Sequence, residues 1–249
     1  MCLMANDSSK TAVPVAGALT LTCWSCGEMR AAHFCSACGK VQPPRPVDYF
    51  TFFGLPRKLN LDNAALEKEF YDLSRRLHPD LNVLADKREQ EWSLEQTSLL
   101  NDAYRTLKDP IKRTEYLLRL EGVELEEQSK SATEKARATG EVKKQVVPPD
   151  LLEEVFELNT QLEELRTQKK LGEDDPALIE EIGRQKLELE EKQEALFAEL
   201  KKDWNQWDQA VDHGSELDRL KIRDQMVALL NRRNYIRNLV RDVSEVLES

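Results

Sequence analysis

Residues 63–80 read NAALEKEFYDLSRRLHPD and predict an amphipathic helix with an abrupt end. Apolar residues recur along it at the spacing of one buried helical face, and they are Leu66, Phe70, Leu73 and Leu77. The helix must end at His78, because Pro79 disfavours helical geometry in the residue before it. A second pattern of helical period covers residues 86–108 after a short loop. The sequence therefore predicts a helical hairpin with His78, Pro79 and Asp80 at its tip.

Further helices are predicted on both sides of this hairpin. A short one at 48–53 ends at Gly54-Leu55-Pro56, which is a stop signal, and another follows Asp109-Pro110. Three long helical segments come after Pro148-Pro149, at 150–171, 176–211 and 215–247. We expect an all-α fold in which these three segments pack as a bundle.

The composition limits the function. A net charge of −10 argues against nucleic acid as the main partner, because binding it depends on cations that neutralise phosphates. The longest apolar runs fall far short of the roughly 20 residues that span a bilayer, so we expect a soluble protein with no membrane partner. Only three histidines occur, and no nucleophile–base pair or phosphate loop is visible, so we expect no enzyme activity.

The N-terminal residues bear on the compartment. Residues 1–20 are small and polar without periodicity, so they are expected to be disordered. They lack both a signal-peptide core and the arginines of a mitochondrial presequence. A bacterial-type cytoplasm is the predicted location, with the mitochondrial matrix as the alternative if a presequence has been removed.

Four of the five cysteines form two CxxC pairs, each followed by glycine, and they are Cys23, Cys26, Cys35 and Cys38. Glycine permits the positive φ at which a turn carries two thiolates to one ion. Four thiolates satisfy tetrahedral Zn²⁺ and leave no open position for chemistry. Residues 21–41 are too few to bury a core, so the metal would supply the folding energy. We predict a structural zinc module, which the proline-rich spacer 43–46 separates from the helices so that chelation spares them.

Alternatives to this zinc site stay open. An iron–sulfur cluster could use the same four cysteines, although the glycine-bearing turns favour zinc. His33 could replace one ligand, although the sequence favours an exposed loop residue there. A thioredoxin-like redox role would need a βαβ unit, and none is predicted.

The His-Pro-Asp tripeptide alone indicates only a helix end and a capped turn, because three residues often match by chance. Its context is more specific. Four segments together resemble the J domain of HscB-type co-chaperones of iron–sulfur cluster biogenesis: DYFTFFGL at 48–55, HPD at 78–80, LNDAYRTL at 100–107 and RTEYLL at 113–118. The resemblance extends over about residues 48–247, and animal mitochondrial members carry similar N-terminal cysteine pairs.

The resemblance implies a docking surface for an ATP-driven chaperone of the DnaK or HscA class, whose ATPase would be stimulated. His78 and Asp80 would make polar contacts, and Pro79 would fix their orientation. Three cations of the helix before the tip would meet an acidic partner, and they are Lys68, Arg75 and Arg76. The alternative is an ordinary solvated face, because acidic residues share it.

Helix 150–171 has more apolar residues than one buried stripe requires. The stripe itself consists of Leu151, Val155, Leu158, Leu162 and Leu165. Leu152 and Phe156 lie off it, and they either widen the core face or form a partner site. The resemblance implies the partner site, a surface for an IscU-type iron–sulfur scaffold protein to which Tyr235 also contributes. Glu153 stands where some relatives have an apolar residue.

The predicted architecture is an L-shaped all-α protein with an N-terminal zinc-knuckle module. Its expected parts are a disordered terminus at 1–20, the zinc module at 21–41, a J domain at 48–121, a linker at 122–147 and a client-binding three-helix bundle at 148–249. The resemblance implies a co-chaperone that delivers the scaffold to the chaperone and promotes cluster transfer. Two rivals stay open: a general J protein for unfolded clients, and a zinc-dependent assembly or coiled-coil protein in which the tripeptide is incidental.

Overall fold

The computed structural model describes residues 22–28, 33–78, 80, 85–123, 125, 151–173 and 175–248. The predictions for the terminus 1–20, for most of the linker 122–147 and for Pro79 lie outside these residues. The described chain is helical apart from loops and an isolated antiparallel bridge between Phe34 and Val41, which confirms the all-α class. Over the same residues, no helix has the length and apolar character needed to cross a membrane.

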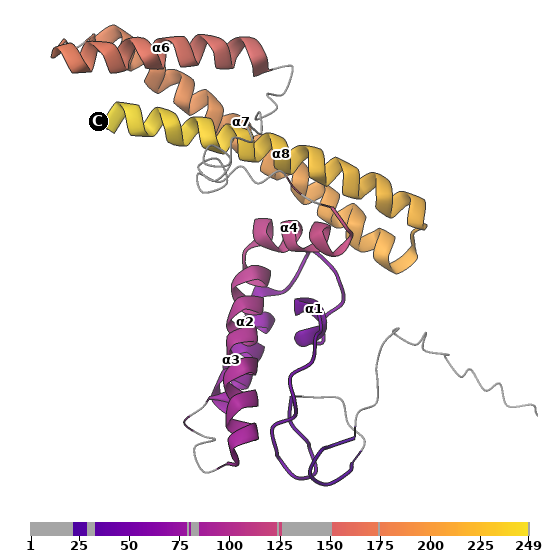
Figure 1. Ribbon diagram of the computed structural model, residues 1–249. Coiled ribbons are helices and arrows are strands. Elements are labelled where there is room, and N and C mark those ends of the chain that lie inside the picture. The colour runs from indigo at the N-terminus through magenta and orange to yellow at the C-terminus, as the bar shows by residue number, and fades with distance from the viewer. Residues whose placement is uncertain are drawn as a thin grey trace, which may run out of the picture. The chain divides into compact units, whose positions relative to one another are not determined.

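The described residues form two compact units. One comprises the described residues up to Phe52 together with those of Glu67–Tyr104, and the other comprises Phe53–Leu66 together with the described residues from Arg105 onward. The first holds the cysteine module, α1 (Tyr49–Phe52) and most of α2 (Asn63–Leu77) and α3 (Lys87–Lys108). The second holds α4 (Pro110–Leu120), α6 (Leu152–Leu171), α7 (Pro176–His213) and α8 (Glu216–Glu248), as Figure 1 labels them. The predicted range 48–121 therefore contributes to both units.

The hairpin of α2 and α3 follows the predicted pattern. The Asp62 carboxylate accepts the N–H groups of Ala64 and Ala65, which caps the start of α2. Between the two helices, the ring of Phe70 stacks on that of Tyr104 with centroids 4.1 Å apart. The Tyr104 hydroxyl donates to Glu67 at 2.9 Å. Ring stacking and this hydrogen bond fix the register of the hairpin.

Helix α4 is capped and anchored by two polar residues. Asp109 accepts the N–H groups of Ile111 and Lys112, and Pro110 fits the first helical turn because it needs no hydrogen-bond acceptor there. Arg113 is buried and donates to the carbonyl of Leu107. Burial lowers the pKa of the Arg113 guanidinium, against the opposing charges of Asp208 and Asp109. The arginine therefore joins α4 to the end of α3.

The three C-terminal helices form a bundle over only part of their length. Helices α7 and α8 lie side by side in opposite directions, whereas the shorter α6 covers one half of the pair (Figure 1). The core shared by all three helices extends to Leu196 of α7 and begins at Tyr235 of α8. Beyond it, the hairpin of α7 and α8 buries Trp204, Trp207 and Met226 without help from α6. The predicted three-helix packing therefore holds for one half of this element.

The half of α7 beyond Leu196 binds residues 57–60, the segment that leads into α2. The Asp208 carboxylate accepts the backbone N–H of Leu59 at 2.7 Å and that of Asn60 at 2.9 Å. It also accepts the Asn60 side-chain amide at 2.8 Å. Trp207 donates its indole N–H to the carbonyl of Arg57 at 3.1 Å. Leu59 itself is fully buried, so the Asp208 carboxylate satisfies a backbone N–H that water reaches poorly.

We expect Asp208→Ala to lower the free energy of unfolding by about 2–4 kcal/mol, because it leaves two backbone donors without their charged acceptor. Asp212→Ala is the matched control, since it removes only the exposed ion pair with Lys58 and should cost less than about 1 kcal/mol. Urea unfolding followed by circular dichroism measures both. Equal losses in the two variants would contradict this account of Asp208.

Candidate functional site

The end of α2 is fixed immediately before the His-Pro-Asp tip. The carbonyl of Leu77, the last residue of α2, accepts the hydroxyls of Ser93 at 2.5 Å and Thr97 at 3.0 Å, both on α3. The Leu77 side chain is fully buried. The position of the tip is therefore set by a buried contact between the two helices of the hairpin.

His78 and Asp80 present their side chains to solvent, with 53% and 85% of their side-chain surfaces exposed. The backbone N–H of Asp80 donates to Nδ1 of His78 at 3.2 Å, so Nε2 is the nitrogen that carries the proton of the neutral ring. The nearer Asp80 carboxylate oxygen lies 3.6 Å from the same Nδ1. The tip thus offers a ring donor and a carboxylate acceptor outward, which suits polar recognition of a partner.

The three cations predicted on this helix are all exposed. Arg76 differs from the other two, because its Cζ atom lies 4.0 Å from the ring centroid of Phe34 in the cysteine module. A guanidinium at this distance over a ring face is held by a cation–π interaction. Arg75 and Arg76 lie in the last turn of α2 next to the tip, Lys68 lies nearer the start of the helix, and the cysteine module contacts Arg76.

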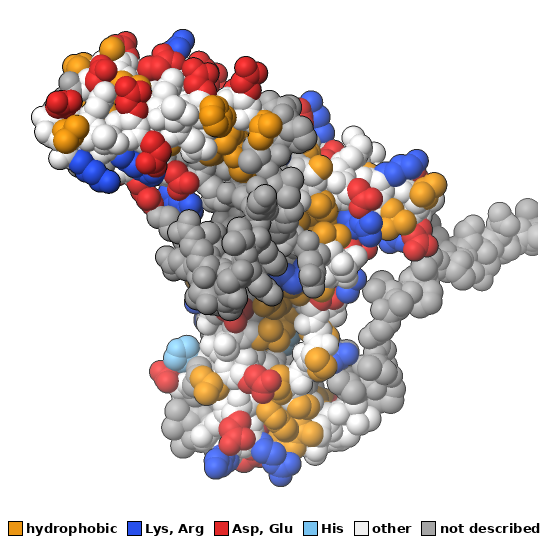
Figure 2. Space-filling view, turned by 45° about the horizontal axis from the view of Figure 1, so that its top comes forward, with side chains coloured by type: hydrophobic (Ala, Val, Ile, Leu, Met, Phe, Trp, Pro, Cys, Tyr) orange, Lys and Arg blue, Asp and Glu red, His pale blue; other side chains and the backbone are white. Residues whose placement is uncertain are grey.

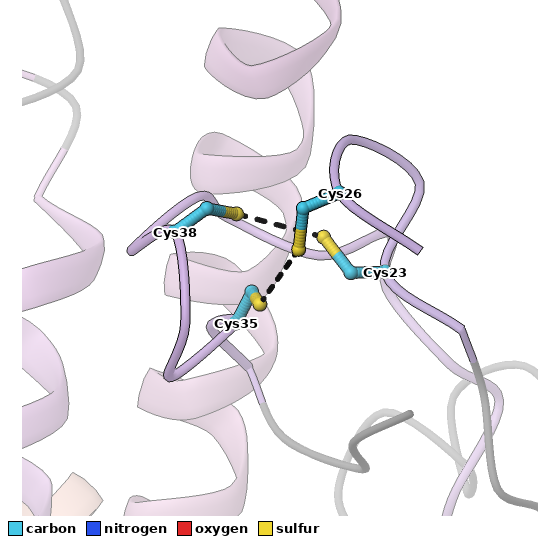
Figure 3. A group of neighbouring side chains, drawn as sticks. All are labelled: Cys23, Cys26, Cys35 and Cys38. Atoms are coloured by element: carbon cyan, nitrogen blue, oxygen red, sulfur yellow. Dashed lines mark hydrogen bonds between the residues drawn. The ribbon is translucent and has the colours of Figure 1, made fainter. Parts of the chain in front are cut away.

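The four predicted cysteines come together, as Figure 3 shows. Their Sγ atoms all lie within 4.8 Å of one another. The Cys23–Cys38 and Cys26–Cys35 separations are 3.7 and 3.6 Å, close to the edge of about 3.8 Å in a tetrahedron of thiolates around one Zn²⁺. A polynuclear cluster would need its thiolates spread around several metal atoms. The cysteines therefore fit a single tetrahedral ion, and no histidine belongs to the group.

The electrostatics of the four thiols also fit a cation. The backbone N–H of Cys26 lowers the pKa of Cys23 to about 6, although burial opposes it. Glu28 N–H acts to lower the pKa of Cys26, but the Cys35 sulfur and burial outweigh it and raise that pKa to about 12. In the second pair, the pKa of Cys35 is likewise lowered and the pKa of Cys38 is raised. Four thiolates together therefore require a positive ion at their centre.

The prediction that a proline-rich spacer separates this module from the helices is wrong. Lys40 pairs with the buried Glu89 of α3 at 2.7 Å, and the Trp24 ring meets the Trp92 ring edge-on at 5.6 Å. His33 bonds to Gln96 at 2.8 Å and to the carbonyl of Phe52 at 3.0 Å. His33 is therefore neither a metal ligand nor a free loop residue, and it attaches the module to the hairpin.

These contacts rest on polar residues that sequence reasoning missed. Glu89, Ser93 and Gln96 are all buried on the face of α3 that also buries Leu100. A signal was present, since three polar residues on an otherwise apolar helical stripe require buried partners. The partner of Gln96 is the carbonyl of Gln42, 2.6 Å from its Nε2. Without the structure, the cysteine module could not be identified as that partner.

Helix α6 and the residue before it have a buried apolar stripe and two apolar residues that lie off it, as predicted. Leu151, Val155, Leu158, Leu162 and Leu165 are buried in the bundle core. Leu152 and Phe156 are 58% and 76% exposed. Figure 2 shows small groups of hydrophobic side chains among many acidic ones on the visible face of the C-terminal helices. Exposed large side chains on a helix whose core stripe is already buried are available to a partner.

Tyr235 is not on that surface. Only 4% of the residue is exposed, and it belongs to the same core cluster as Val155 and Leu158. Burial raises the pKa of its phenol. The predicted direct contact of Tyr235 with a partner therefore needs correction: in this structure the ring packs inside the bundle, and Leu152 and Phe156 alone form the exposed pair.

The chain is similar to known proteins over the region that holds the tip. The family model for the DnaJ domain matches residues 48–116. The iron–sulfur cluster co-chaperone protein HscB homolog of Arabidopsis thaliana is 32% identical over 178 residues, which cover 67% of this chain and 65% of that protein. The HscB protein of Mus musculus is 39% identical over 42% of this chain and 47% of its own length. The chain thus spans less than two thirds of either relative.

Solved structures support the fold. The crystal structure of human co-chaperone protein HscB covers 90% of this chain and 98% of its own, with a TM-score of 0.56 and 24% identity. A helical hairpin with exposed His78 and Asp80 at its tip and a matching DnaJ-domain model defines a J-domain protein. Within that class, the relatives to which this chain is similar are of the HscB type.

Proposed function

We propose that this protein is a co-chaperone that binds an IscU-type iron–sulfur scaffold and presents it to a DnaK- or HscA-class chaperone, whose ATPase it stimulates. One observation carries the proposal. A J-domain tip with exposed His78 and Asp80 and a separate exposed apolar pair, Leu152 and Phe156, occur in the same chain. ATP is hydrolysed by the chaperone, and the chain itself performs no chemistry.

The tip and the exposed cations of α2 serve as the chaperone-docking surface in this proposal. His78 and Asp80 contact polar groups of the chaperone, and Lys68 and Arg75 with Arg76 meet acidic ones. Pro79, outside the described residues, keeps its predicted role of fixing the turn. Electrostatic attraction of this kind accelerates encounter more than it strengthens the complex, so the docking should be salt-sensitive.

Leu152 and Phe156 serve as anchors for the folded scaffold. They lie one turn apart on α6, with acidic residues including Glu153 and Glu154 beside them. An apolar centre with a charged rim is typical of a specific interface that can still be released. Tyr235 supports this surface from within the core. The predicted compartment stays a bacterial-type cytoplasm or the mitochondrial matrix, since the relatives include bacterial and animal proteins.

A competition experiment tests this against a general J protein for unfolded clients. A folded, fluorescently labelled scaffold is titrated with the full chain, and a reduced, carboxymethylated protein is then added as an unfolded competitor. We expect saturable binding of the scaffold that a tenfold excess of the unfolded protein does not displace. Displacement by the unfolded chain, or no binding of the scaffold, would favour the rival function.

We further propose that the ion held by the four cysteines is zinc. Elemental analysis of purified protein should give about one zinc per chain. Cys26→Ser should remove most of it, because three ligands and water bind more weakly than four thiolates, whereas Cys2→Ser is the matched control and should keep it. Iron in place of zinc, or a protein without metal, would contradict this prediction.

A further inference from the structure

The position of Phe34 depends on the fold of the second knuckle, the loop from Cys35 to Lys40 that follows it. Phe34 and Val41 face each other across the antiparallel bridge that closes the second knuckle. Inside that loop, Cys35 N–H donates to Lys40 and Gly39 N–H donates to Cys35. Few side chains of the described module are buried, so the ion at Cys35 and Cys38 must stabilise the loop that carries Phe34.

Phe34 in turn holds Arg76 of the docking helix. The Arg76 guanidinium lies over the Phe34 ring at 4.0 Å, and Arg76 is two residues from His78. A free arginine side chain on a helix surface samples many rotamers, and a ring beneath the guanidinium restricts them. Arg76 is still exposed, so its charge stays available to a partner from a fixed position.

A buried chain of hydrogen bonds connects the metal ligands to the hairpin as well. Gln42 donates its side-chain N–H to Cys23 Sγ at 3.4 Å, and its own carbonyl accepts Gln96 Nε2 at 2.6 Å. The Oε1 atom of the same Gln96 amide is hydrogen-bonded to Nδ1 of His33. The ligand shell and α3 therefore share hydrogen-bond partners, and loss of the ion disturbs both.

We propose that the metal state of the four cysteines controls the orientation of Arg76, and through it the affinity of the docking face for the chaperone. With metal, Phe34 holds the guanidinium in its docking position. Without metal, the second knuckle opens, Arg76 is released, and each docking event must order the side chain again. This inference rests on the proposed function, because it assigns regulation to the chaperone-docking surface.

The first test needs no chaperone. In protein with ¹⁵N-labelled arginine, the Arg76 Nε–H resonance should show a ring-current shift that disappears after chelation under reducing conditions, with metal loss confirmed by elemental analysis. Phe34→Leu, which keeps an apolar side chain in the buried position, should abolish the same shift while metal is bound. The Arg75 resonance is the internal control and should not move. An Arg76 resonance whose chemical shift stays the same after metal removal would overturn the proposal.

The second test measures chaperone affinity in the presence of ATP. Metal removal should weaken binding of the wild-type protein about two- to fivefold, which is the effect of an exposed cation–π contact. Arg76→Ala should bind equally with and without metal, whereas the neighbouring control Arg75→Ala should keep the metal dependence. Equal metal dependence in the two variants would overturn the proposal. A wild-type protein that binds no chaperone in either metal state would instead overturn the proposed function.

Discussion

His78→Gln will abolish stimulation of the partner ATPase and leave the helices intact. The side chain is 53% exposed at the tip of the hairpin, so its replacement removes little packing. Helix α2 ends on the buried carbonyl of Leu77, which Ser93 and Thr97 hold independently of the imidazole. What the substitution does remove is the ring nitrogen that the tip offers to the chaperone. Steady-state ATP hydrolysis and circular dichroism on the same preparation measure both effects.

His213→Gln is the matched control for this variant. His213 is also exposed and also ends a helix, but it lies at the end of α7, far along the chain from the tip. We expect it to stimulate the ATPase as the wild-type protein does. Normal stimulation by His78→Gln would remove the tip as the docking site, and the rival assembly or coiled-coil protein would then be preferred.

Replacing Leu152 and Phe156 together by alanine will weaken scaffold binding by more than tenfold and leave scaffold-independent ATPase stimulation nearly normal. Both side chains are more than half exposed, and the core stripe of α6 is complete without them. Truncation of an interface anchor costs about 2 kcal/mol or more in binding free energy. Loss of packing within the bundle should be small, because neither side chain is part of the core.

Two controls separate binding from stability in this experiment. Leu187→Ala removes a leucine of similar exposure from α7 and should change neither scaffold affinity nor melting temperature. Leu158→Ala removes a core leucine and should lower the free energy of unfolding by about 2–5 kcal/mol. If the double variant melts as the Leu158 variant does, or binds the scaffold normally, the exposed pair is not the client surface.

Local sequence signals predicted the helices well because their causes are local. Asp62 and Asp109 cap helices as their positions before apolar patterns indicate. Helix α6 buries the stripe that its period defines and exposes Leu152 and Phe156. The CxxC spacing likewise predicted that four thiols meet. In each case the relevant atoms lie within one helix or two short loops.

Contacts between distant segments escaped the sequence for an equally physical reason. A histidine between two cysteine pairs has no local partner, and nothing in its neighbourhood indicates that Gln96, 63 residues away, would bond to it. Tyr235 was predicted on a surface, but its position on the face toward α6 and α7 became clear only once those helices were packed. Proline-rich sequence implied a spacer, whereas the chain turns back and packs the cysteine module against α3.

The most direct test of the central claim measures the chaperone's ATPase while the scaffold is titrated, with and without a fixed low concentration of this protein. A co-chaperone that binds both partners raises the local concentration of scaffold at the chaperone. We therefore predict that the scaffold concentration for half-maximal stimulation falls more than tenfold when the chain is present. A scaffold titration whose midpoint does not move, with the chain shown to bind the chaperone, would contradict the account.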